Sequence, residues 1–175
     1  MDLASGSLDK LAEKLIDFVA AGRVATRVEL KDIRVIDVSA KCNPKIKGTL
    51  EPNLNVECRV AGRESGALEI ACDYQFNARV GEAQVAEAVI KYLLMYEIKG
   101  SEPVIEEDLA EFAVGNGTLH SWPFVREFLH GLTSRMGYPP YTLPVFHFKP
   151  KPPEKKEVPE KEPVTPEPGV PKSTT

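Results

Sequence analysis

The sequence lacks the features that would mark a nucleic-acid binder or a membrane protein. Its 22 Lys and Arg against 26 Asp and Glu leave a formal net charge of −4, which offers no positive surface to a phosphate backbone. No apolar run approaches the roughly 20 residues that a membrane helix needs. The N-terminal residues also lack a basic stretch followed by an apolar one, so we expect no secretory signal. We therefore expect a cytoplasmic protein without nucleic-acid partners or membrane insertion.

Cysteine and histidine are scarce, with three of each in 175 residues. The odd number of cysteines and the lack of a CxxC pair argue against a disulfide framework and a metal site. Cys58 and Cys72 fall at apolar-facing strand positions, so we interpret them as buried thiols. His120 and His130 lie near opposite sides of one predicted helix and share no face with a nucleophile or a second carboxylate. The sequence therefore predicts no catalytic residue, no metal and no cofactor.

The last part of the chain has the composition of a disordered segment. Residues 149–175 contain eight Pro and eleven Lys or Glu, and no aromatic residue follows Phe148. Such a segment cannot bury enough apolar surface to offset its chain entropy. We expect a disordered tail over residues 149–175 and one folded domain over residues 1–148.

Hydrophobic periodicity predicts one N-terminal helix and then four strands. The helix spans residues 7–21 and stops at Gly22. The strands span residues 27–42, 49–62, 67–80 and 84–100. A phase slip near Asp32 indicates a bulge in the first strand, and Pro52 places the start of the second at an edge or before the ladder.

The stretch 84–100 fits a helix as well as a strand. We prefer a strand, because the short turn after Val80 favours a hairpin and the stretch is rich in β-branched and aromatic residues. Both of its faces are then apolar, since Leu93 and Met95 lie on the second one. The order of the elements predicts an α+β fold with a four-stranded antiparallel β-meander.

Two helices are predicted after the strands. A short acidic helix spans residues 102–117 and ends at Gly115 or Gly117, and a long helix begins at Pro123 and ends at Gly137. The apolar residues of the long helix cover an arc of roughly 160°, wider than the roughly 100° that one surface requires. They are Trp122, Phe124, Val125, Phe128, Leu129, Leu132 and Met136. This excess apolar surface predicts a homo-oligomer.

The stretch WPFVREFLHGLTSRMGYPPYTLPVF, residues 122–146, resembles the hallmark of the SecB family of bacterial chaperones. A bulky residue, Pro and an aromatic come first, then Arg-Glu, Thr-Ser-Arg, a Gly-aromatic-Pro-Pro element and Leu-Pro. The matching residues are Trp122, Pro123, Phe124, Arg126, Glu127, Thr133, Ser134, Arg135, Gly137, Tyr138, Pro139, Pro140, Leu143 and Pro144. The segment LKDIRVIDVSAKCN, residues 30–43, is similar to the first strand of that family.

The resemblance implies a holdase without catalysis or cofactor. It implies a four-stranded antiparallel sheet under a long helix, assembled through that helix into a tetramer that is a dimer of dimers. Clients would be unfolded proteins, which export-type members pass to the translocase motor SecA. This sequence departs from those members, because a Pro/Lys/Glu-rich tail replaces their second helix and acidic tail, and an N-terminal helix is added. It looks more like the SecB-like chaperones of toxin–antitoxin systems, whose client is an antitoxin.

Two sets of residues are candidates for contacts. We expect the client surface to include Leu93, Met95, Trp122, Tyr138 and Tyr141. We expect the oligomer interface to include Val125, Phe128, Leu129, Leu132 and Met136. Two other functions stay open: a small hot-dog-like acyl-thioester hydrolase or other ligand-binding enzyme, and a dedicated adaptor without general holdase activity.

Overall fold

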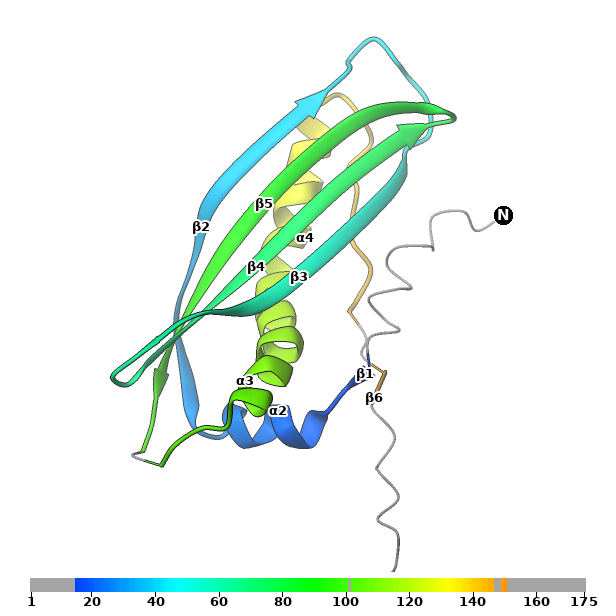
Figure 1. Cartoon of the computed structure of the whole chain (residues 1–175). Coiled ribbons are helices and arrows are strands. Elements are labelled where there is room, and N and C mark those ends of the chain that lie inside the picture. Colours follow the sequence, from blue (N-terminus) through cyan, green and yellow to red (C-terminus); the bar gives the residue numbers. More distant parts are fainter. Residues whose placement is uncertain (1–14, 101, 147–148, 151–175) are drawn as a thin grey trace, which may run out of the picture.

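The computed structural model describes residues 15–100, 102–146 and 149–150. A four-stranded antiparallel sheet dominates it, formed by β2 (Val28–Cys42), β3 (Glu51–Glu64), β4 (Ala67–Val80) and β5 (Ala83–Ile98). One face of the sheet is covered by a column of three helical segments, α3 (Glu106–Phe112), η1 (Ala113–Gly117) and α4 (Thr118–Arg135) (Figure 1). The predicted α+β class with a four-stranded antiparallel sheet is confirmed.

The order of the strands, β2–β5–β4–β3, shows that the predicted meander is wrong. Strands β3, β4 and β5 pair in sequence, but β2 pairs with β5, which is the order of a Greek key. The loop 43–50 therefore carries the chain across the end of the sheet to its other edge (Figure 1). The apolar residues on both faces of β5 fit its interior position, because the side chains of two neighbouring strands flank them on either face. Pro52 lies on the edge strand β3, as predicted.

The phase slip of the first strand is also confirmed. The pairing of β2 with β5 shifts between Leu30 and Asp32 and again between Val35 and Asp37. Before the first shift Leu30 pairs with Tyr96, and after it Ile33 pairs with Leu94. Both partners are buried beneath the helical column, so the bulge keeps the apolar residues of β2 on one face of the sheet.

The core lies between the sheet and the helical column. Strands β4 and β5 supply most of it with alternate residues that are at most 2% exposed. These are Leu68, Ile70, Cys72, Tyr74, Phe76, Ile90, Tyr92, Leu94 and Tyr96. From the column, Leu109, Phe112, Val125 and Leu129 pack against them. Burial of these side chains is the main term that stabilises the fold, at about 25 cal/mol per Å² of apolar surface.

The helical column does not break where the sequence predicts. Helix continues from Glu106 to Arg135 through the π-helical turn η1, and Gly115 and Gly117 lie inside that turn rather than at a helix end. A Cβ atom on Gly117 would lie 3.0 Å from Ile70 Cγ2 and 3.2 Å from Cys72 Sγ. Glycine is needed there to let the column approach the sheet. Pro123 likewise lies inside α4 and does not begin it.

Cys58 and Cys72 are buried as expected, but they are not free thiols. They occupy directly paired positions on β3 and β4, and the structure joins their sulfur atoms in a disulfide. The spacing of the two residues could not show this, because it depends on the register of the hairpin. Cys42 is the free cysteine and is exposed.

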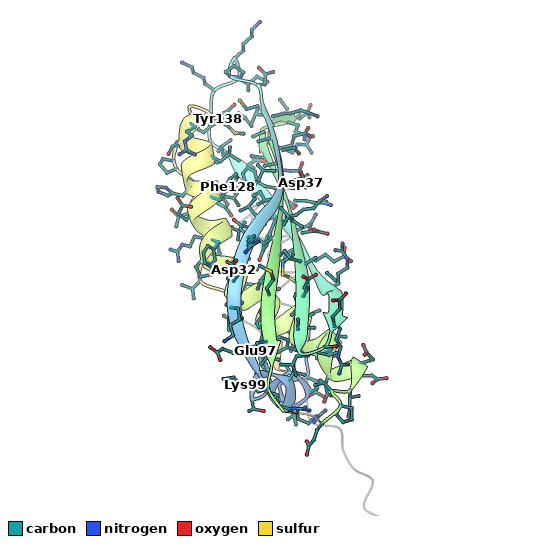
Figure 2. The ribbon with its side chains drawn as sticks, turned by 90° about the vertical axis from the view of Figure 1, so that its left-hand side faces the viewer. Asp32, Asp37, Glu97, Lys99, Phe128 and Tyr138 are labelled. Carbon is teal, nitrogen blue, oxygen red and sulfur yellow. A yellow bond between two sulfur atoms is a disulfide. The ribbon has the colours of Figure 1, made fainter. Side chains whose placement is uncertain are left out.

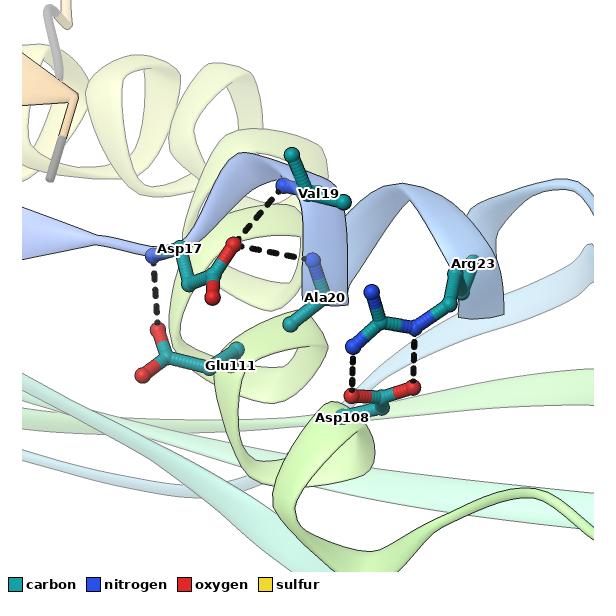
Figure 3. Close-up of polar contacts among 6 residues, drawn as sticks. All are labelled: Asp17, Val19, Ala20, Arg23, Asp108 and Glu111. Atoms are coloured by element: carbon teal, nitrogen blue, oxygen red, sulfur yellow. Dashed lines mark hydrogen bonds and ion pairs between the residues drawn. The ribbon is translucent and has the colours of Figure 1, made fainter. Parts of the chain in front are cut away.

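The described residues of the N-terminal region differ from the predicted helix over residues 7–21. Most of the predicted span lies outside the described residues; Leu15–Ile16 form the short strand β1, and α2 spans Phe18–Ala25 with Gly22 inside it. Asp17 caps α2, because its side chain accepts hydrogen bonds from the backbone N–H groups of Val19 and Ala20 (Figure 3). A polar residue at 17 therefore separates strand from helix.

Two polar contacts and one packing contact fix this N-terminal unit to the column. Arg23 of α2 makes a bidentate ion pair with Asp108 of α3, and Glu111 accepts a hydrogen bond from the Asp17 backbone N–H at 3.1 Å (Figure 3). The Arg23 guanidinium holds the pKa of Asp108 below its ordinary value. Ile16 is 1% exposed and packs beside Gly115. Strand β1 then pairs in parallel with β6 (Lys149–Pro150), so the two ends of the described chain meet.

The predicted division of the chain at residue 148 stays a prediction. Lys149–Pro150 form β6, and residues 151–175 lie outside the described part of the chain. Among the helices that the structure describes, none has the length and apolar character to cross a bilayer.

Candidate functional site

The face of the sheet that carries no helix, here called the open face, is polar and ion-paired. Lys91 Nζ of β5 lies 2.9 Å from Asp37 Oδ2 of β2, and Arg59 Nη1 of β3 lies 2.6 Å from Asp73 Oδ2 of β4. Because Asp73 is also the register partner of Lys91, charges of alternating sign run across all four strands. Further pairs lie toward both ends of the sheet, and two lysines lower the pKa of Glu29 to about 2 by hydrogen bonding. Such a face is suited to solvent.

Leu93 and Met95 lie on this open face and are half-buried. Their register partners on β2 are Arg34 and Asp32, which form an ion pair of 2.7 Å with each other. On the other side they face Ala71 and Glu69 of β4. Three of the four register partners of these two apolar side chains are therefore charged.

The segment 138–146, here called the strap, covers part of the opposite face. The chain leaves α4 at Gly137, whose φ of 82° turns it back along the helix. The strap then runs in extended form beside α4, on the side of β3 (Figure 1). Its first half is tied to the fold by Tyr138, whose hydroxyl donates to the carbonyls of Asn43 and Ile46 at 3.0 and 2.8 Å. Thr133 Oγ1 accepts from the backbone N–H of Tyr141 at 2.9 Å.

The second half of the strap is held mainly by apolar contacts around Trp122. Leu143 is fully buried, and the Phe146 ring lies 4.7 Å from the Trp122 ring between centroids. Trp122 Nε1 donates a hydrogen bond of 3.0 Å to the carbonyl of Pro144. Val145 points outward and is 64% exposed. Trp122 therefore lies beneath the strap, and the surface of α4 and the sheet that the strap covers is here called the groove.

The five predicted client residues do not form one surface. Trp122, Tyr138 and Tyr141 meet at the strap, where Tyr141 also stacks on Phe76 at 5.8 Å. Leu93 and Met95 lie on the open face, on the other side of the sheet. Trp122 and Tyr138 are 5% and 8% exposed, so the strap must move before a client can touch the tryptophan.

The predicted interface residues are also divided by burial. Val125 and Leu129 are fully buried against the sheet within one chain, while Phe128, Leu132 and Met136 are only partly buried. The sheet and the strap thus bury three of the seven apolar residues of the wide stripe, Trp122, Val125 and Leu129.

A different apolar surface is left exposed, at the β2 side of α4. Val35, Ile36 and Val38 of β2 are 50%, 53% and 42% exposed, and Phe124 of α4 is 48% exposed. Phe124 lies over Tyr92, with 6.4 Å between ring centroids, and Tyr92 is the register partner of Val35. We call these four residues the edge patch; Figure 2 looks onto this side, with Phe128 of α4 beside β2. Three of the four residues from 35 to 38 are apolar, and this local excess of apolar residues on an edge strand is the sequence signal for the patch.

The side chain of His120 is held in the fold by its contacts with Tyr96. Its Nδ1 atom lies 2.9 Å from the hydroxyl of Tyr96, and the two rings are 5.9 Å apart. Burial lowers the pKa of His120 and raises the pKa of Tyr96. Within the described ranges no cluster of three His, Cys, Asp or Glu residues could hold a metal ion.

Comparison with known proteins gives relatives of one kind. No protein-family model matches the chain. The SecB-like chaperones Rv1957 and MT2006 of two Mycobacterium tuberculosis strains, H37Rv and CDC 1551, are each 26% identical over 144 residues, which cover 70% of this chain and 80% of the relative.

A solved structure agrees with these sequence relatives. It is that of Mycobacterium tuberculosis Rv1957, described as a SecB-like chaperone in complex with a ChAD peptide from the Rv1956 HigA1 antitoxin. It superposes with a TM-score of 0.67 at 25% identity, covering 74% of this chain and 96% of that one. The resemblance first given by the stretch 122–146 is thereby confirmed in sequence and in fold: this chain is similar to the SecB-like chaperones.

Proposed function

We propose that this protein is an ATP-independent chaperone that holds non-native segments of a client protein. The observation that carries the proposal is the fold shared with Rv1957, which was solved with an antitoxin peptide bound. Burial of apolar client side chains would supply the affinity, less the cost of ordering the client. No nucleotide is needed for such binding, because it is an equilibrium between two surfaces.

The client class that we favour is an antitoxin rather than a precursor for export. The relative with a bound peptide was solved with a segment of an antitoxin. The N-terminal unit β1–α2, which is fixed to α3 by Arg23 and Asp108, is also the departure from export-type members that the sequence indicated. Export and hand-over to SecA stay predictions of the family resemblance.

We further propose that the protein acts as a homo-oligomer, with the edge patch as the contact between copies. Its four side chains are each 42% to 53% exposed and lie along an unpaired strand edge of the sheet. An exposed apolar strand edge is a site for pairing with another chain. A tetramer is the assembly that the resemblance implies, and α4 borders the patch that would form it.

The alternative functions have less support. A thioester hydrolase needs a carboxylate or histidine free to act in a pocket, whereas His120 is half-buried and bonded to Tyr96. The relatives Rv1957 and MT2006 are named as chaperones, which favours a protein that is not an enzyme. A dedicated adaptor differs from a holdase in its range of clients, and the aggregation assay described next separates the two.

The experiment is an aggregation assay without nucleotide. A reduced, unfolded model protein is diluted into buffer with and without one oligomer equivalent of this chain, and light scattering is followed. We expect scattering to be suppressed, because exposed apolar client segments are held apart. Unchanged scattering would refute general holdase action, and co-purification of a single antitoxin in that case would identify an adaptor.

A further inference from the structure

The strap contributes Tyr138 and Leu143 to the hydrophobic core, and it also shares features with a bound peptide. It is extended, forms no strand ladder with β3, and contributes apolar side chains to a groove on the body of the protein. Three of its nine residues are Pro, which have no backbone N–H to donate. Apart from the backbone N–H groups of Tyr138 and Tyr141, which bond to Thr133, the reported contacts of the strap are made by side chains and by the carbonyl of Pro144.

The contacts of the second half of the strap define a short recognition pattern. Leu143 fills an apolar pocket, the next residue, Pro144, presents its carbonyl to Trp122 Nε1, and Phe146 stacks on the Trp122 ring. A buried aliphatic side chain is thus followed by a carbonyl at the next position and an aromatic ring at the third. Every peptide has the carbonyl, so the groove selects only for the two side chains and for an extended backbone.

We propose that this groove is the client site, and that the strap occupies it as an internal competitor. The occupant would be an extended client segment with an aliphatic residue and, three positions later, an aromatic one. This inference rests on the proposed chaperone function and adds to it the place and the chemistry of binding. In this proposal Trp122 belongs to the client site, as the sequence predicts, whereas Leu93 and Met95 lie on the open face, outside the groove.

The anchoring of the strap supports its release from one end. Its first half is tied by the hydrogen bonds of Tyr138 and by the bond from Tyr141 to Thr133. After the strap, the next described element is β6, which pairs with β1 over two residues only. A client can therefore displace residues 142–146 while the chain stays anchored at Tyr138. The apparent affinity of the protein for a client is then the affinity of the open groove multiplied by the fraction of molecules in which the strap has left it.

The test uses two variants of the full chain that place the same charge on opposite sides of the strap. Leu143→Asp puts a carboxylate into the apolar pocket and should unseat the strap, whereas Val145→Asp puts it on the solvent side. The probe is a fluorescein-labelled peptide with the strap sequence YPPYTLPVF, followed by fluorescence anisotropy. We expect the peptide to bind the Leu143→Asp protein about tenfold or more tightly than the Val145→Asp protein or the unmodified chain.

Trp122, the only tryptophan of the chain, gives an independent measurement of the release of the strap. In the Leu143→Asp protein the emission of Trp122 should shift to the red, because its ring gains water when Phe146 leaves. Adding the unlabelled strap peptide, which contains no tryptophan, should reverse the shift. A control peptide with the Leu143→Asp change should neither bind nor reverse it.

Equal peptide binding by the two folded variants would overturn the inference. If circular dichroism shows that Leu143→Asp is unfolded, the unmodified chain decides: excess strap peptide must weaken aggregation suppression, and the control peptide must not. Suppression that the strap peptide leaves unchanged refutes the groove as the client site but leaves the chaperone function standing. Absence of suppression by the unmodified chain refutes the proposed function itself.

Discussion

The hydrogen bond between Tyr74 and Ser121 is a buried polar contact in the middle of an apolar core. Both side chains are fully buried, and their oxygen atoms lie 2.7 Å apart. Ser121 Oγ also lies 2.6 Å from the carbonyl of Gly117, to which it can donate, so the serine would keep a partner without the tyrosine. The tyrosine hydroxyl, whose pKa is raised by burial, would be left unpaired without the serine.

This asymmetry predicts unequal effects of the two truncations. Ser121→Ala should lower the free energy of unfolding by about 1–3 kcal/mol, since an unpaired buried hydroxyl bears its full desolvation cost. Tyr74→Phe should lower the free energy of unfolding by about 1 kcal/mol, because Ser121 still donates a hydrogen bond to the carbonyl of Gly117. Urea denaturation measures both values and that of the double variant. The double variant should be less destabilised than the sum of the two; an additive result would show that the bond contributes nothing.

At the scale of elements, the approach of the helical column to the sheet depends on the glycines of η1. Gly117 lies against Ile70, Cys72 and Cys58, and its φ is not positive. It is therefore required for space and not for an unusual backbone conformation. Gly131 in α4 is a natural comparison, because a Cβ there would meet only the end of the Arg135 side chain at 3.8 Å.

Replacing each of these glycines by alanine should change stability in opposite directions. Gly117→Ala should destabilise by about 1–3 kcal/mol, since the added methyl overpacks the core beneath the π-helical turn. Gly131→Ala should stabilise by about 0.5–1 kcal/mol, because alanine loses less conformational entropy in a helix. Thermal melts of both variants give the comparison. If Gly117→Ala also stabilises, the close approach of η1 is not a constraint.

The sequence predicted elements well wherever periodicity was local. The four strands and the bulge near Asp32 follow from alternation within single stretches. Long-range pairing was not readable in this way, which is why the meander and the free thiols of Cys58 and Cys72 were wrong. The glycines of η1 and Pro123 read as helix ends because local propensity ignores the packing that holds them inside a helix.

The candidate sites were harder to predict than the fold. The stretch 122–146 identified the relatives because it is an ordered motif, but it could not separate residues that face the sheet from those that face away. Val125 and Leu129 are therefore core residues, and the exposed Val35 and Phe124 were not selected as interface residues. The exposure of a helix's apolar residues depends on how many of them the rest of the same chain covers. Tertiary packing sets that number.

At the scale of the whole molecule, the edge patch should control assembly. Phe124→Glu places a charge in the patch, and His130→Glu places the same charge at an exposed position elsewhere on α4. We expect the first change to reduce the oligomer to smaller species in size-exclusion chromatography with light scattering. The second should leave the molar mass unchanged. Identical masses for both variants would place the contact between copies on another surface.

The meeting of β1 and β6 has a consequence for the order of folding. Its two strands come from opposite ends of the described chain, so their contact closes the longest loop in the molecule and gains only two residue pairs. The hairpins of β3, β4 and β5 close short loops and need no distant partner. On the ribosome the sheet can form while the strap is still being synthesised. Until residues 138–146 have left the ribosome, the newborn protein therefore has no strap over Trp122, and this segment is then the first peptide of its own chain to reach the groove.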